Sequence, residues 1–99
     1  MGDVYLKVFE NSKYRLVAVS DADLVGETFR EGKLKLEVKT DFYKGTITSV
    51  SQAIREIDSA DIANLVGNRI VEAAVKRGLI DPCAIVRIAG VPHVQIVRM

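Results

Sequence analysis

A strict alternation of apolar and charged side chains over residues 33–39 is the feature that most constrains the fold of this chain. The inward positions are Leu34, Leu36 and Val38, and the outward positions are Lys33, Lys35, Glu37 and Lys39. Successive side chains of a β-strand point to opposite faces, so the pattern predicts a strand with one buried and one solvated face. Half-exposed strands of this kind are typical of antiparallel sheets.

Periodicity elsewhere predicts more strands and two main helices. We expect further strands over residues 4–9, 14–19, 46–48, 85–89 and 93–98. Apolar residues at helical spacing predict helices over about 50–58 and 61–77, with a short helical turn near 21–25. We therefore expect one α+β domain over residues 1–99, built on a mostly antiparallel sheet of five to six strands.

The helix expected over 61–77 is unusually apolar. At 100° per residue its apolar side chains occupy roughly 220° of the circumference. Such breadth predicts either cover on two sides or surplus apolar surface around Val71 and Val75, available to a second chain. Gly67 falls inside this helix, where glycine costs about 1 kcal/mol against alanine. Close packing would explain it, and contact with a ligand or subunit is the alternative.

Composition excludes several classes of function. The chain has 14 basic and 13 acidic residues, so bulk charge attracts it neither to nucleic acid nor to a membrane. Neither a membrane-length apolar run nor a secretory signal is visible, so we expect a cytoplasmic protein with no membrane partner. Cys83 and His93 are each the sole residue of their type. Together with the absence of phosphate-loop, dinucleotide, zincin and nucleophile-elbow motifs, this leads us to expect no catalytic residue, cofactor or metal.

Charge laid over strand alternation is the strongest functional signal. The cations that would face outward from strands are Lys7, Lys33, Lys35, Lys39 and Arg87, and Tyr5 and Phe9 share a face with Lys7. No acidic residue occurs from Cys83 to the end of the chain. If these faces align, they form a basic surface with aromatic rings, which is typical of single-stranded nucleic-acid binding. The alternative is an ordinary solvated sheet face whose lysines protect an edge.

Other polar residues are weaker candidates. His93 follows a Gly-Val-Pro segment and has a near-neutral ordinary pKa, although a lone histidine is commonly structural. Asn64 and Arg69 could form a polar site with Gly67, or Arg69 could simply lie on the solvated side of its helix. Cys83 is expected to be a half-buried apolar filler. An enzyme would require Asn64, Arg69 and His93 to converge in one pocket.

Four segments of the chain resemble one family. They are VGETFREG (25–32), DIANLVGNR (61–69), GLIDP (78–82) and VRIAGVPH (86–93). Together they resemble the Domain of Unknown Function 424 family of short archaeal proteins, and the likeness spans nearly the whole chain. The resemblance implies special roles for Asn64, Gly67, Arg69, Arg87 and His93. It also favours a link to RNA or to a translation-related protein, and it carries over no catalytic residue.

Three functions therefore stand in order of expectation. The first is a small non-enzymatic binding module, associated with RNA or translation, that uses a basic sheet face. The second is a protein-interaction or homodimer domain that uses the apolar face of the helix expected over 61–77. The third is an enzyme near Asn64, Arg69 and His93.

Overall fold

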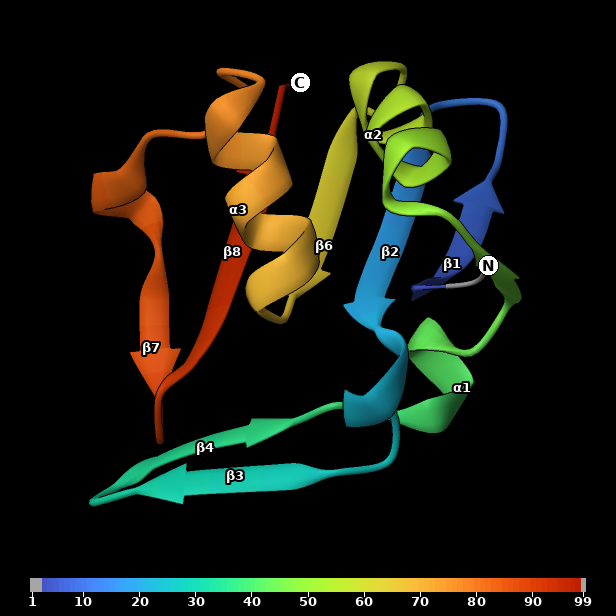
Figure 1. Cartoon of the computed structure of the whole chain (residues 1–99). Helices are drawn as coiled ribbons and strands as arrows, with labels where there is room; N and C mark the ends of the chain where they lie inside the picture. Colours follow the sequence, from blue (N-terminus) through green and yellow to red (C-terminus); the bar gives the residue numbers. More distant parts are fainter. Residues whose placement is uncertain (1–2, 99) are drawn as a thin grey trace.

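A six-stranded sheet forms the centre of the protein, whose computed structural model describes residues 3–98 (Figure 1). Its strand order is β5-β1-β2-β6-β8-β7, and every neighbouring pair is antiparallel except β2 and β6. The strands are β1 (Val4–Glu10), β2 (Arg15–Asp21), β5 (Thr46–Thr48), β6 (Ile62–Val66), β7 (Val86–Ile88) and β8 (Val91–Val97). The prediction of an α+β fold on a mostly antiparallel sheet of five to six strands is confirmed.

Two helices cover one face of this sheet. Helices α2 (Val50–Asp58) and α3 (Asn68–Lys76) lie side by side across it in Figure 1. Their apolar sides pack on inward residues of the central strands, and the buried set includes Val17, Val19, Ile57, Leu65 and Ile70. None of the helices in residues 3–98 is long and apolar enough to cross a membrane.

The other face is partly covered by a separate hairpin and a short helix. The hairpin pairs β3 (Thr28–Glu31) with β4 (Leu34–Glu37), and α1 (Thr40–Tyr43) follows it. Leu36, Val38 and Tyr43 bury themselves against Ala18 and Val66 of the sheet. This burial raises the pKa of Tyr43 to about 12. The hairpin lies at the lower end of the sheet in Figure 1, and away from it Gln95 and Val97 of the second face are exposed.

The prediction of one helix over 61–77 is wrong. The segment divides into the strand β6, the single residue Gly67 and the helix α3. β6 lies between β2 and β8 in the centre of the sheet, where a strand buried on both faces has a continuous apolar run. Periodicity alone does not separate such a run from a buried helix. The wide apolar arc therefore results from placing the residues of a strand on a helical wheel. Val71 is 1% exposed, so it is not available to a second chain.

Several local predictions are confirmed and several are corrected. Helix α2 matches 50–58, and its cap is Ser49, whose Oγ accepts from the Gln52 amide at 3.1 Å. The turn near 21–25 is a 3-10 helix, Ala22–Leu24, and a second one is Pro82–Ala84. The strand expected over 33–39 spans only β4, which belongs to the hairpin rather than to the main sheet. The strand expected over 93–98 begins earlier, because Val91 and Pro92 belong to β8.

The start of α3 is anchored by a buried carboxylate. Asp21, the last residue of β2, is 5% exposed, and it accepts the amide protons of Arg69 (2.9 Å) and Ile70 (3.1 Å). These amides belong to the first turn of α3, whose N–H groups have no partner within the helix. Burial raises the pKa of Asp21, although the two amide hydrogen bonds act in the opposite direction.

The Asp21 carboxylate, and not a position inside a helix, explains why residue 67 is a glycine. Its φ of 112° lies in a region that L side chains rarely adopt. A Cβ at Gly67 would lie 2.3 Å from Cγ of Asp21. The close packing expected at Gly67 from the sequence is therefore found. The group packed against it is the side chain of Asp21, at the end of β2.

Replacing Gly67 with alanine should destabilise the fold far more than replacing Gly78. Both glycines have positive φ, but a Cβ at Gly78 would meet nothing within 4 Å. Gly78→Ala should cost about 1–2 kcal/mol for its backbone conformation alone. Gly67→Ala adds the clash with Asp21, for roughly 2–5 kcal/mol in all. Denaturant unfolding of both variants measures the difference. Equal losses in the free energy of unfolding would show that the Asp21 side chain moves aside without destabilising the fold.

Candidate functional site

The three lysines predicted on a sheet face lie on or beside the hairpin, outside the six-stranded sheet. Lys33 is in the turn between β3 and β4, and Lys39 directly precedes α1. Nζ of Lys35 is 3.7 Å from Oε1 of Glu37, two residues along the same strand. All three are exposed, but they do not share a sheet face with Arg87 or with Lys7.

The aromatic part of the predicted platform is used inside the fold. The ring of Phe9 stacks on that of Phe42, with centroids 5.4 Å apart, and Phe42 meets Tyr43 edge-on. Nζ of Lys7 lies 5.2 Å from the Phe9 ring and donates to the carbonyl of Asp41 at 2.6 Å. Phe9 and Lys7 therefore fix α1 to the sheet instead of forming an open surface for bases.

The candidates Asn64, Arg69 and His93 do not converge. Asn64 and His93 lie on the sheet face opposite α2 and α3, where His93 is placed between Val66 of β6 and Val86 of β7. Arg69 is exposed at the start of α3, on the other side of the sheet. Within residues 3–98, no group of three or more His, Cys, Asp or Glu side chains is placed to hold a metal ion.

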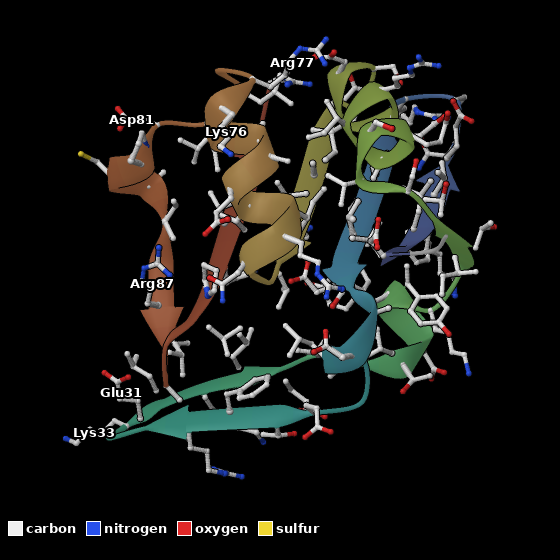
Figure 2. The ribbon with its side chains drawn as sticks, in the orientation of Figure 1. Glu31, Lys33, Lys76, Arg77, Asp81 and Arg87 are labelled. Atoms are coloured by element: carbon white, nitrogen blue, oxygen red, sulfur yellow. The ribbon has the colours of Figure 1, made fainter. Side chains whose placement is uncertain are left out.

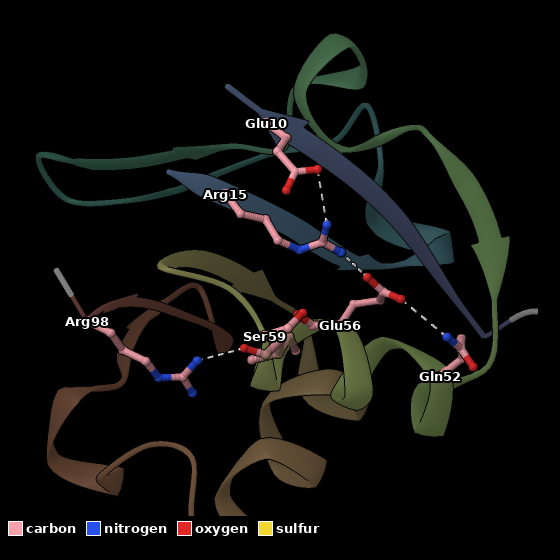
Figure 3. A network of polar contacts seen from close by, with 7 residues as sticks. Glu10, Arg15, Gln52, Glu56, Ser59 and Arg98 are labelled. Atoms are coloured by element: carbon pink, nitrogen blue, oxygen red, sulfur yellow. Dashed lines mark hydrogen bonds and ion pairs between the residues drawn. The ribbon is translucent and has the colours of Figure 1, made fainter. Parts of the chain in front are cut away.

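Two further arginines have structural roles at the end of the sheet near the helix C-termini. Figure 3 shows Arg15 between Glu10 and Glu56, with which it forms ion pairs. Nη1 of Arg98 donates to two backbone carbonyls at the end of α2. They are those of Ile57 (2.7 Å), in the last turn of the helix, and Ala60 (3.0 Å), just after it. These contacts link β2 and the end of the chain after β8 to α2, although Nε of Arg15 is buried without a hydrogen-bond partner among residues 3–98.

A groove between α3 and β7 brings together two cations that are far apart in the sequence. Its volume is about 270 Å³, and it is lined by Asn68, Val71, Glu72, Val75, Lys76, Pro82, Ile85, Arg87 and Pro92. Arg87 reaches this side because it pairs with Pro92, out of phase with Val86 and His93. Figure 2 shows Lys76 on α3 and Arg87 on β7. Neither makes an ion pair with another residue of 3–98. We call this the α3–β7 groove.

A second groove runs between the two main helices. It has a volume of about 580 Å³ and is lined by Val50, Ser51, Ile54, Arg55, Ala73, Lys76 and Arg77. Every ionisable side chain in this lining is basic. We call it the α2–α3 groove, and it shares Lys76 with the α3–β7 groove.

Comparison with known proteins assigns the family. The family described as "Protein of unknown function (DUF424)" matches residues 9–99. The chain belongs to this family. The DUF424 chain is also similar to the crystal structure of "an uncharacterized conserved protein from Methanopyrus kandleri", with a TM-score of 0.77. The two are 24% identical, and the match covers 94% of this chain and 89% of that one, which supports a shared fold. No curated protein matches the chain significantly.

Sequence reasoning missed Arg55 and Lys76 of the DUF424 chain as candidates. Lys76 follows Glu72 by four residues, and this spacing is typical of a solvated helix surface. Glu72 and Lys76 do lie on one side of α3, but β7 runs beside this side, so the two residues line a groove. No periodicity within α3 could reveal this return. The expectation for Cys83 is also corrected, because its residue is exposed rather than half-buried.

The stability of the DUF424 chain should fall on mild acidification through His93. Burial lowers the pKa of His93, so the folded state binds a proton less readily than the unfolded state. Stability is then fully present above the ordinary histidine pKa of about 6.5 and is lost as pH falls below it. His93→Gln should flatten this decline in denaturant unfolding between about pH 7.5 and about pH 5.5. Identical pH slopes in the two proteins would contradict the assignment.

Proposed function

We propose that this chain is a small non-enzymatic binding module for RNA, with the α3–β7 groove as its main contact with the phosphate backbone. The observation that carries the proposal is the placement of Lys76 and Arg87 on one groove, free of ion pairs with residues 3–98. Most of the affinity of proteins for nucleic acids comes from such cations, which release counterions from the phosphates.

The residues of the α3–β7 groove suit a phosphate chain. Arg87 offers a planar fork of donors that can bind two phosphate oxygens at once, and Lys76 supplies a mobile point charge. Asn68 lines the same groove and can donate its amide to phosphate or sugar oxygens. Glu72 is the one carboxylate in the lining, so two cations stand against one anion.

The hairpin lysines form a second group of cations, outside the sheet face that carries Arg87. In Figure 2, Lys33 lies at the tip of the hairpin, below Arg87 and beyond the lower end of β7. Glu31, between them, accepts the backbone amide proton of Ala89 at 2.7 Å and so fixes the hairpin to the β7–β8 turn. An RNA that leaves the α3–β7 groove past Arg87 would next approach Lys33 at the hairpin tip, whereas Lys35 and Lys39 lie further from the groove along the chain.

The remaining predicted binding residues contribute less directly to this proposal. Arg69 is exposed next to Asn68 but is not among the residues that line the groove. Gly67 shapes the start of α3 through Asp21. Asn64 and His93 are partly buried on the sheet face away from α2 and α3, which would bind RNA only as a separate surface.

Binding of a short single-stranded RNA should weaken steeply with salt. The logarithmic slope should fall by about one unit for Lys76→Gln and again for Arg87→Gln, since each removes one phosphate contact. Lys44→Gln, which removes an exposed cation outside the groove, should leave the slope unchanged. Fluorescence anisotropy over a salt series measures all four proteins.

Two outcomes would refute this function. Failure of the wild-type protein to retain total cellular RNA at low salt would exclude RNA binding altogether. Equal effects of the Lys44, Lys76 and Arg87 substitutions would show that binding depends on general charge and not on the α3–β7 groove.

A further inference from the structure

The α2–α3 groove combines an apolar floor with basic rims. Val50 and Ile54 from α2 and Ala73 from α3 form the floor, and the small side chain of Ala73 leaves the space between the helices unfilled. With about 580 Å³, it exceeds the roughly 300 Å³ at which ligand-binding clefts begin. Ile54 is 5% exposed and belongs to the core, so the partly buried Val50 and Ala73 supply the aliphatic surface that an outside partner can reach.

The rims of the groove carry one sign of charge. Arg55 is exposed on α2 and makes no ion pair with another residue of 3–98. Arg77 is 3.0 Å from Asp58, but both side chains are about half exposed, so the pair is weak and screened. Lys76 adds a third cation, and Figure 2 shows Lys76 and Arg77 together at the end of α3. An anionic partner would relieve the repulsion among them.

We propose that the α2–α3 groove docks an acidic amphipathic helix of a partner protein. Such a helix places aliphatic anchors at three- and four-residue spacing, which fit an aliphatic floor. Its flanking carboxylates would meet Arg55 on one rim and Lys76 with Arg77 on the other. The proposal adds a second surface to the RNA-binding function and does not rest on it.

The composition of the floor favours a protein helix over RNA. RNA bases bind through stacking on aromatic rings or arginine planes and through hydrogen bonds to their edges. The floor residues Val50, Ile54 and Ala73 offer neither, and RNA sugars and phosphates would leave this apolar surface unpaired. Aliphatic residues also line the α3–β7 groove, but there Asn68 adds a side-chain amide beside Arg87.

A random peptide display library selected against the full chain tests this proposal. Enriched peptides should have aliphatic residues at helical spacing with Asp or Glu beside them, and their affinity should fall with salt. Arg55→Glu and Ser51→Glu should each weaken binding of these peptides about tenfold, because each places a carboxylate on the groove. Both positions are exposed, and a carboxylate at Ser51 suits the first turn of α2. Lys44→Glu, the same charge reversal outside the groove, should bind as the wild type does.

Several results would overturn it. An absence of enriched peptides, or enrichment without acidic residues, would remove the partner chemistry. Loss of RNA affinity in Arg55→Glu equal to that in Arg87→Glu would assign the groove to RNA. Self-association of the wild type that Arg55→Glu abolishes would make a second copy of this chain the occupant. Peptide binding that persists while RNA binding fails would refute the RNA-binding function and leave this inference standing.

Discussion

The contact between Asp21 and the first turn of α3 determines how the rest of the structure is arranged. Because β2 and β6 are parallel and Ser20 is paired with Val66, the next residues, Asp21 and Gly67, meet at the same end of the sheet. The Asp21 carboxylate there satisfies amides of α3 that have no partner in the helix. A negative charge is also favoured at a helix N-terminus. One carboxylate thus joins the two central strands to the helix that follows them.

The position of α3 in turn creates both grooves. One side of the helix faces α2 and the other faces β7, so Lys76 near its end lines both. The helix ends in a cap in which Gly78 donates to the carbonyl of Val75 (3.0 Å) and Leu79 donates to that of Ala74 (2.9 Å). The chain then turns towards Pro82 and returns as β7, which carries Arg87 to the groove.

The sequence predicted local elements well and their assembly poorly. The apolar spacing over residues 50–58 is a local signal, and α2 was found over these residues. The prediction for residues 62–66 was wrong because the burial of this strand on both faces depends on β2 and β8, which are distant in the sequence. Likewise, alternation placed Arg87 on a strand face, but only the return of β7 beside α3 pairs it with Lys76. The chemistry of the site therefore lies in contacts that no local pattern encodes.

The central claim is that these long-range contacts build an anionic-ligand surface on the helix-covered side of the sheet. Backbone amide shifts in an NMR titration of the intact chain with a short single-stranded RNA test it most directly. The account predicts shifts concentrated in residues 68–76 and 82–92, with the neighbours of Asn64 and Gln95 on the sheet face away from α2 and α3 unchanged. Shifts confined to that face or to the hairpin lysines, or no shifts at low salt, would contradict it.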